Sequence, residues 1–345
     1  MKLNLAFIGF GNVARAFARI LTDRQSQITA DYGLRWNTTA IATANHGCVT
    51  STGGIDLLAA AELVQRGGNL SELHGSISAP DPLAVIENCN ADILFETTPL
   101  NIDDGEPAVG HIRTALARGI HVVTANKGPI AFAYRELKSL AAERGVSFRF
   151  EGTVMDGTPV FNLVEYCLPG VQVLGFRGVL NSTTNLILTG MESGRSFEES
   201  LVSAKQRGIA EANADYDIDG WDAAVKAVAL ANVLMNADSR PASVQREGIR
   251  NITVEDVHSA GASGLAVRLI ARGKRTTDGV AITVAPERVP LGSALGSVRG
   301  TSNVLVLETD LMGEIAIVEN DAEVEQTAYA LLSDMIRIHD TLLTI

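Results

Sequence analysis

The chain opens with a short apolar segment, "LNLAFIGF", that runs into the loop Gly9-Phe10-Gly11-Asn12-Val13-Ala14. A Gly-x-Gly-x-x-(Gly/Ala) run is informative where it joins a strand to a helix. Its first glycine permits a tight turn, and its second lets a pyrophosphate approach the backbone. The small Ala14 allows close packing of helix on strand, and the helix N-terminus attracts the anion. We therefore predict a dinucleotide site at Gly9 to Val13, the alternative being a turn that has only a structural role.

The first 150 residues alternate strand-like and helix-like segments, which is the pattern of βαβ units and a parallel sheet. Strands are expected in "LNLAFIGF", "TTAIATA", "ADILFET" and "IHVVTA". Helices are expected in "GNVARAFARILTD", where Val13, Phe17, Ile20 and Leu21 share one face, in "DLLAAAELVQRG", and in "PAVGHIRTALARG" between Pro107 and Gly119. We therefore expect a Rossmann-type doubly wound α/β fold.

The sequence pattern changes at Glu151, after which strand-like and helix-like segments are longer and alternate less regularly. We expect a dinucleotide-binding domain over 1–150, completed by 315–345, and an α+β substrate-binding and dimerisation domain over 151–314. In the second part, "SFEESLVSAKQRG" has Ser196 and Glu199 spaced as a capping box, with Gly208 closing the helix. Paired strands are expected in "SNVLVLETD" and "EIAIVE". The last segment predicts an amphipathic helix with an apolar stripe of Val324, Ala328, Leu331, Leu332 and Met335.

Composition excludes several classes of function. The 345 residues carry a formal net charge of −12, with a pI near 5.0, and show no cluster of Lys and Arg suited to nucleic acid. No apolar run reaches the roughly 18 to 20 residues of a membrane span. Three cysteines, none at a short metal or redox spacing, suit a reducing compartment, so we expect a cytoplasmic location.

The cofactor preference depends on the end of the second expected strand. NAD-selective folds usually place an acid there to bind the ribose hydroxyls. The segment here reads "ATANHGCVTSTGG" and contains no acid before Asp56, which favours NADP. Arg15 is a candidate for holding the 2′-phosphate, the alternative being an ordinary solvated helix residue.

Two further segments follow strands of the expected sheet. Thr97-Thr98-Pro99 comes after "DILFE", and Asn126-Lys127-Gly128-Pro129 comes after "IHVVTA". Ligands of open α/β sheets bind beyond the carboxyl ends of the strands. Lys127 is therefore a candidate for the reaction cleft, the alternative being a solvated loop lysine.

An unusual helix is expected from Asp219 to about Asn236. Asp222 and Lys226 lie four residues apart on one face, yet the other residues around them are almost wholly apolar. Charges on an apolar helix must be paired or line a wet cavity, so we expect this pair in a cleft. Asp219 is expected as the N-cap, with Asp222 at the third helical position.

The loop before this helix carries four acids, Glu211, Asp215, Asp217 and Asp219. Converging carboxylates suit a substrate with a cationic amino group or a metal ion, whereas a solvated acidic loop is the alternative. The six histidines are scattered, which argues against zinc. No cysteine has a neighbouring base, which argues against a thioester intermediate. Hydride transfer without a covalent intermediate is the chemistry that remains.

Taken together, the segments "GFGNVARAFA", "FETTPLNIDDGEPAVGHIRTALARGIHVVTANKGPIA", "EGTVMDGTPV", "GVLNSTTNLILTGM" and "AKQRGIAEANADYDIDGWDAAVK" resemble homoserine dehydrogenase. The resemblance spans nearly the whole chain. It departs from the family pattern at Ala214, where proline is expected, and at Ser182, where glycine is common. Both departures concern loop rigidity more than chemistry.

The resemblance implies NAD(P)-dependent interconversion of L-homoserine and L-aspartate 4-semialdehyde, in the aspartate-derived pathway to threonine and methionine. It implies binding of the substrate amino group by Glu211 and Asp217, and catalysis by Asp222, Lys226 and Lys127. The implied cofactor contacts are Thr97, Thr98, Lys127, Gly300 and the loop of Gly9, Phe10, Gly11, Asn12 and Val13. A monovalent cation, Na⁺ or K⁺, is implied at Glu151, Val154, Asp156 and Thr158, mainly through backbone carbonyls.

The resemblance further implies a homodimer formed through sheet edges, to which "VQVLGFRGVL" is a candidate contributor, and a short form of the family without a C-terminal regulatory domain. Two alternatives stay open. One is another two-domain Rossmann oxidoreductase acting on sugars, against which the acidic loop argues. The other is a dinucleotide sensor without turnover, against which Lys127, Asp222 and Lys226 argue.

Overall fold

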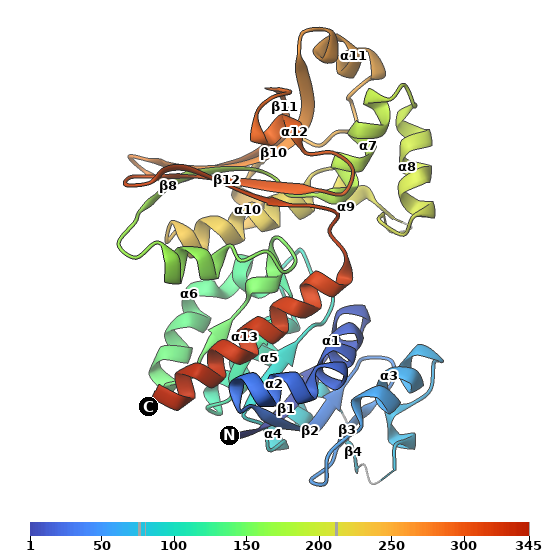
Figure 1. Ribbon diagram of the computed structural model, residues 1–345, viewed down its shortest axis with the longest axis vertical. Helices are drawn as coiled ribbons and strands as arrows, with labels where there is room; N and C mark the ends of the chain where they lie inside the picture. Colours follow the sequence, from blue (N-terminus) through green and yellow to red (C-terminus); the bar gives the residue numbers. More distant parts are fainter. Residues whose placement is uncertain (75–76, 80, 211–212, 345) are drawn as a thin grey trace. The chain divides into compact units, whose positions relative to one another are not determined.

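The structure is a computed structural model that describes residues 1–74, 77–79, 81–210 and 213–344. It contains two compact units (Figure 1), the first formed by residues 1–157 and 323–345 and the second by residues 158–322. The boundaries expected from the sequence, at 150 and 315, lie slightly earlier in the chain. The first unit thus consists of two segments of sequence, and the second unit is inserted between them.

The first unit is built on a seven-stranded sheet with the order β4-β3-β2-β1-β5-β6-β7. Its strands are β1 (Lys2–Ile8), β2 (Arg35–Ala42), β3 (Cys48–Thr50), β4 (Ile77–Ala79), β5 (Ile93–Glu96), β6 (His121–Thr124) and β7 (Phe148–Arg149). The expected parallel arrangement is confirmed for β2, β1, β5, β6 and β7. It is wrong for β3, which is antiparallel to both of its neighbours, because the short connection after β2 reverses the chain. β4 is antiparallel to β3 and therefore runs in the same direction as β2.

Helices cover both faces of this sheet. They are α1 (Asn12–Asp23), α2 (Gln25–Tyr32), α3 (Leu57–Gln65), α4 (Pro82–Asn88), α5 (Ala108–Ala117), α6 (Lys127–Arg144) and α13 (Val324–Thr344), with short 3₁₀ turns at Leu70–Glu72 and Glu151–Thr153. Side chains of β1 alternate between two cores, since Leu5 and Phe7 pack on one side while Ala6 and Ile8 pack on the other. This alternation is what a doubly wound sheet requires.

The C-terminal helix α13 belongs to the first unit and packs against α1, as Figure 1 shows. Its predicted apolar stripe is confirmed for Ala328, Leu331, Leu332 and Met335, which are buried in the same core as Phe17 and Leu21 of α1. The stripe is wrong at Val324, which is 39% exposed because it is the first residue of the helix, ahead of the part that reaches the core.

The second unit is built on a six-stranded sheet with the order β13-β12-β8-β10-β11-β9. Its strands are β8 (Val173–Val179), β9 (Gln245–Arg246), β10 (Leu265–Thr276), β11 (Gly279–Pro290), β12 (Asn303–Thr309) and β13 (Gly313–Glu319). The predicted pairing of β12 with β13 is confirmed. The expectation that "VQVLGFRGVL" contributes to a sheet edge is wrong, because β8 pairs with β12 on one side and β10 on the other.

The helices of the second unit include α7, α10 and α11, which pack on strands of its sheet. The full set of helical elements described in this unit is a π-helical turn (Leu163–Cys167), α7 (Ser182–Glu192), α8 (Phe197–Gln206), α9 (Asp215–Ile218), α10 (Trp221–Leu234), a 3₁₀ turn (Pro241–Ser243), α11 (Val254–Ala262) and α12 (Ala294–Ser297). The predicted Ser196/Glu199 capping box on α8 is confirmed. Over the described ranges of the chain, no helix combines the length and apolarity needed to cross a membrane.

Candidate functional site

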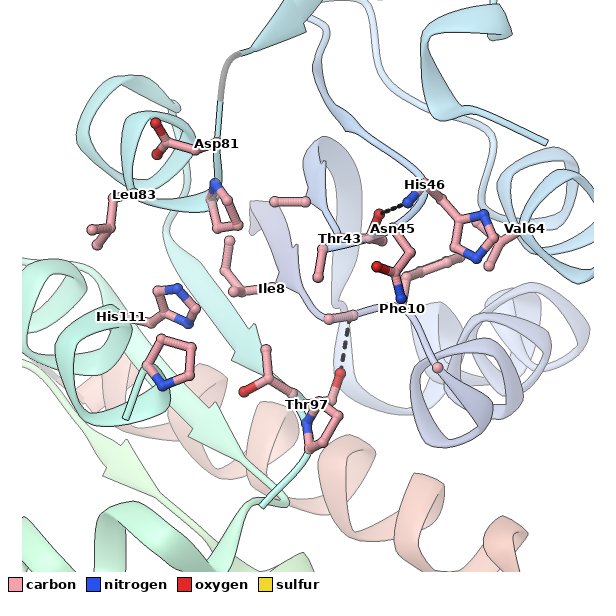
Figure 2. Close-up of a pocket in the computed structure, with 18 of the residues that line it drawn as sticks. Ile8, Phe10, Thr43, Asn45, His46, Val64, Asp81, Leu83, Thr97 and His111 are labelled. Carbon is pink, nitrogen blue, oxygen red and sulfur yellow. Dashed lines mark hydrogen bonds between the residues drawn. The ribbon is translucent and has the colours of Figure 1, made fainter. Parts of the chain in front are cut away.

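A cavity of about 1000 Å³ lies in the first unit beyond the carboxyl ends of β1, β2 and β5. Figure 2 shows how side chains from these strand ends and from neighbouring loops surround it. The residues predicted to bind cofactor that line it are Gly9, Phe10, Gly11, Thr97 and Thr98. This is the sheet edge at which ligands of α/β folds bind, so the location agrees with the sequence prediction.

The two glycines of the predicted phosphate loop have different structural roles. Gly9 adopts a φ of 85°, and a Cβ there would lie 2.7 Å from the carbonyl carbon of Thr97. The hydroxyl of Thr97 donates to the Gly9 carbonyl at 2.9 Å, a contact drawn in Figure 2. Gly11 has open space where its Cβ would be, next to the N-terminus of α1. Gly9 therefore fixes the turn, while Gly11 leaves room for a phosphate.

The segment Thr43 to His46 that follows β2 contains no acid, although Asp81 and Glu106 also line the cavity. The backbone N–H of His46 donates to the Thr43 hydroxyl at 2.8 Å, and the Nδ1 of His46 lies 2.9 Å from the Gly68 carbonyl. Asn45 also lines the cavity (Figure 2). Arg15 lines it from α1 and donates to Asn12 Oδ1 at 2.6 Å.

Sequence reasoning assigned no role to Glu96, the last residue of β5, although its side chain is completely buried. Its carboxylate accepts from the Thr98 N–H at 3.0 Å and lies 3.0 Å from the Thr124 hydroxyl. A further hydrogen bond joins it to the Thr98 hydroxyl. Burial raises the pKa of Glu96 to about 7, an effect that these hydrogen bonds only partly oppose. The sequence signal was an acid at the end of an apolar strand.

His111 of α5 is a second cavity residue that sequence reasoning missed, and Figure 2 shows its ring at the cavity wall. Burial lowers the pKa of His111, an effect that the charge of Glu106 partly opposes. Among the residues that the structure describes, none forms a hydrogen bond with its Nδ1.

Lys127 is the first residue of α6 rather than part of a loop. Asn126 is the N-cap, and its Oδ1 accepts from the Gly128 N–H at 2.9 Å. The Asn126 amide also donates to the Thr98 carbonyl at 3.0 Å. The segments after β5 and β6 are therefore tied together, as expected for parallel strands that end at one edge.

The second unit brings together three of the residues predicted to bind and convert substrate. The Nζ of Lys226 lies 3.6 Å from Asp222 Oδ2, and these side chains are only 15% and 16% exposed. Lys226 also donates to the Leu180 carbonyl at 2.7 Å. The amide of Asn181 donates to Asp217 Oδ1 at 2.7 Å and to Asp222 Oδ2 at 3.0 Å. The predicted helical Asp/Lys pair is confirmed, and Asn181 is an additional member that sequence reasoning missed.

The remaining acids of the loop are arranged differently from the prediction. Asp215 and Asp219 both pair with Arg250, at 2.7 and 2.9 Å, and this hydrogen bonding lowers the pKa of Asp219. The prediction that Asp219 caps α10 is wrong, because Gly220, at a φ of 79°, occupies the N-cap position and Asp219 ends α9. Glu211 lies outside the described residues.

The residues predicted to hold a cation have their own protein contacts. Glu151 is buried and its backbone N–H donates to Asp334 at 2.9 Å. Asp156, at a φ of 42°, accepts from the Thr327 hydroxyl at 2.7 Å, and Thr158 donates to Glu319 at 3.1 Å. Val154 is also buried. Over the part of the chain that the structure describes, no group of three or more His, Cys, Asp or Glu side chains is arranged to hold a metal ion.

Gly300, a predicted cofactor residue, lies in the second unit. Its φ is 64°, and its N–H donates to the Thr189 hydroxyl at 3.2 Å. A cofactor contact by Gly300 stays a prediction.

Comparison with known proteins covers both units. A family model described as homoserine dehydrogenase matches residues 159–336, and one described as the NAD-binding domain of homoserine dehydrogenase matches residues 9–151. An NAD(+)-dependent homoserine dehydrogenase of Pseudomonas canavaninivorans is 37% identical, with 99% of this chain and 97% of that protein covered. A homoserine dehydrogenase of Methanocaldococcus jannaschii is 38% identical, with 98% and 99% covered. A hyperthermophilic archaeal homoserine dehydrogenase solved with NADPH superposes with a TM-score of 0.83 at 31% identity, with 99% and 98% covered.

Proposed function

This chain belongs to the homoserine dehydrogenase family, and on that basis we propose that it interconverts L-homoserine and L-aspartate 4-semialdehyde using a nicotinamide dinucleotide. The observation that carries the proposal is the buried Asp222/Lys226 pair on an apolar helix, with Asp217 beside it. We assign residues 1–150 and 315–345 to cofactor binding and 151–314 to substrate binding and dimerisation.

The substrate roles follow from the chemistry of homoserine, which carries an ammonium, a carboxylate and a terminal hydroxyl. Asp217, together with Glu211, would bind the ammonium group. Asp222 and Lys226 would orient the hydroxyl and handle its proton. A lysine suits this work because it donates a hydrogen bond to a developing alkoxide and, when neutral, accepts the proton.

The first unit fits a dinucleotide. Gly9 and Gly11 form the turn and the open space that a pyrophosphate needs, and Thr97 and Thr98 line the same cavity. Phe10, Asn12 and Val13 would complete the contacts of this loop, and Gly300 is a further proposed cofactor residue. When bound, the cofactor accepts the hydride from the carbinol carbon. Lys127, at the start of α6, would act as the second catalytic lysine.

We propose a preference for NADP over NAD. The segment Thr43 to His46 after β2 has no acid of its own to bind ribose hydroxyls or repel a 2′-phosphate, while Arg15 lines the cavity as a cation. Asp81 and Glu106 also line this cavity. Relatives with NAD(+) in the name and with bound NADPH are both known, so the choice depends on these side chains.

A monovalent cation, Na⁺ or K⁺, is proposed at Glu151, Val154, Asp156 and Thr158. The side chains of Asp156 and Thr158 already form hydrogen bonds with Thr327 and Glu319, so ligation would use backbone carbonyls, which suit a hard cation. Activity in Na⁺ or K⁺ salts, compared with a bulky organic cation, measures this dependence.

We propose a cytoplasmic homodimer that serves the aspartate-derived pathway to threonine and methionine. A dimer contact through a sheet edge of the second unit would involve β13, because β8 is paired on both sides and β9 has two residues.

The reaction is tested by absorbance of reduced nicotinamide with purified protein, L-homoserine, and NAD or NADP in parallel at alkaline pH. A signal that requires homoserine supports the proposal. The ratio of the rate with NADP to the rate with NAD shows which cofactor the protein prefers. A signal with sugars but not homoserine would favour a sugar oxidoreductase. Binding without turnover would indicate a dinucleotide sensor.

A further inference from the structure

Asn181 lies between the end of β8 and the start of α7 and is 5% exposed. Its side chain forms three hydrogen bonds to three separate elements. Its Oδ1 accepts from the Thr184 N–H at 2.8 Å, which caps α7. Its Nδ2 donates to Asp217 of α9 at 2.7 Å and to Asp222 of α10 at 3.0 Å.

The orientation of this amide is determined by its partners. A backbone N–H can only donate, so the group that faces Thr184 must be the amide oxygen. The nitrogen then faces the two carboxylates, which can only accept when ionised. Each of its two hydrogens points to a different carboxylate, so one neutral side chain donates hydrogen bonds to two acidic ones.

The turn that carries Asn181 also holds the catalytic lysine. The carbonyl of the preceding residue, Leu180, accepts from Lys226 at 2.7 Å, while Lys226 lies 3.6 Å from Asp222. Two adjacent residues of one turn thus contact three of the groups assigned to substrate.

We propose that Asn181 is a positioning residue of this active site, whose amide holds the carboxylates of Asp217 and Asp222 in the arrangement that receives homoserine. The proposal depends on the substrate role proposed above for Asp217, Asp222 and Lys226. Two neighbouring carboxylates repel each other, and a donor shared between them offsets that repulsion.

A purely structural alternative is that Asn181 only caps α7. Asn, Asp and Ser are about equally good N-caps, so capping alone does not distinguish among them. Of the three, only Asn can accept from Thr184 and also donate to two carboxylates. Substitutions at this position can therefore separate the two roles.

The first test is Asn181→Ser, which retains a capping oxygen without adding charge and replaces the two amide donors with one hydroxyl on a shorter side chain, too few to serve both carboxylates. We expect the melting temperature to stay within about 5 °C of the wild type, consistent with an intact cap. We expect kcat/KM for homoserine to fall by at least about tenfold, because at least one of the two charge-assisted hydrogen bonds is lost, while KM for the dinucleotide stays within about twofold.

The second test is Asn181→Asp, which retains the cap and replaces the donors with a third carboxylate facing Asp217, Asp222 and Lys226. We expect a larger loss at alkaline pH than in Asn181→Ser. The activity relative to wild type should recover as pH falls, since a protonated carboxyl donates one hydrogen bond again. If Asn181 only capped α7, the activity of Asn181→Asp relative to wild type would not depend on pH in this way.

Asn185→Ser is the matched control, because Asn185 is also a buried asparagine of α7 but donates to the Ser302 carbonyl instead of the carboxylates. It should lower stability without a selective loss of homoserine turnover. Wild-type kcat/KM in both Asn181→Ser and Asn181→Asp would overturn the positioning role. An inactive wild type, or an active Lys226→Ala variant, would instead contradict the proposed function of the site.

Discussion

At the scale of single side chains, Lys127 and Lys226 are expected to be indispensable for turnover while contributing little to the fold. Each supplies an amine that the proposed chemistry needs, at the start of α6 and within α10. Lys127→Ala and Lys226→Ala should each lower kcat by about 10²–10⁴-fold, the usual effect of losing an acid or base. Steady-state kinetics with circular dichroism as the folding control checks this, and full activity in both variants would refute the assignment.

Glu96 should make stability depend on pH in a way that one substitution can isolate. Its pKa is about 7 in the fold against 4.5 for the exposed group. The stability that its neutral form contributes is therefore fully present below about pH 4.5 and is lost as pH rises through about 7. Above that range, burying the charge costs about 3 kcal/mol.

Glu96→Gln resembles the neutral carboxyl. Its free energy of unfolding relative to wild type should therefore increase by up to about 3 kcal/mol between about pH 4.5 and pH 8. Urea denaturation at a series of pH values measures the difference. Because His111 and His121 are present in both proteins, their own titrations cancel, and a constant difference would show that Glu96 does not titrate in this range.

Asn45 offers a test of cofactor choice. Asn45→Asp introduces at the end of β2 the carboxylate that binds ribose hydroxyls and repels a 2′-phosphate. The ratio of kcat/KM for NADP to that for NAD should fall by at least about tenfold, which corresponds to about 1.4 kcal/mol. An unchanged ratio would mean that the phosphate is recognised elsewhere.

At the scale of elements, the two glycines of the β1–α1 turn are expected to differ in role, Gly9 in stability and Gly11 in cofactor binding. Gly9→Ala places a Cβ 2.7 Å from the Thr97 carbonyl carbon at a φ of 85° and should destabilise the protein by more than the 1–2 kcal/mol or so of the left-handed conformation alone. Gly11→Ala meets open space and should fold normally but raise KM for the dinucleotide. Thermal denaturation and cofactor titration distinguish the two variants, and equal stability in both would contradict this division.

Regular elements could be predicted because their signals are local. The apolar run of β1, the capping box at Ser196 and the stripe through Leu331 each depend on near neighbours in sequence. The reversal of β3 could not be predicted from alternation alone. Asp219 was misassigned because it ends α9, and the left-handed Gly220 after it is the N-cap of α10.

The candidate site was predictable to a similar degree. The Asp222/Lys226 pair follows from helical spacing, which sequence shows directly. Asn181 was missed because its acidic partners are set by tertiary structure, whereas Glu96 was missed although an acid at the end of an apolar strand is visible in the sequence. Asn181 contacts acids 36 and 41 residues away, and nothing in its own segment indicates them.

At the scale of the whole molecule, the proposed dimer points to the edge strand β13. Val318 on that strand is 47% exposed, so Val318→Lys would place a charge at the proposed contact and should raise the dimer dissociation constant by at least about tenfold. Light scattering over a dilution series measures this. Leu343→Lys, at a residue 61% exposed on α13, is the control, and an equal effect of both would argue against β13.

The division of the first unit between two segments also constrains synthesis on the ribosome. Phe17 and Leu21 emerge early, but the core that buries them also needs Leu331 and Met335 of α13. Residues 158–322, which form the whole second unit, are translated in between. The second unit can therefore fold co-translationally while the α1 face of the first unit still lacks its closing helix, and during that interval this apolar face is open to chaperones.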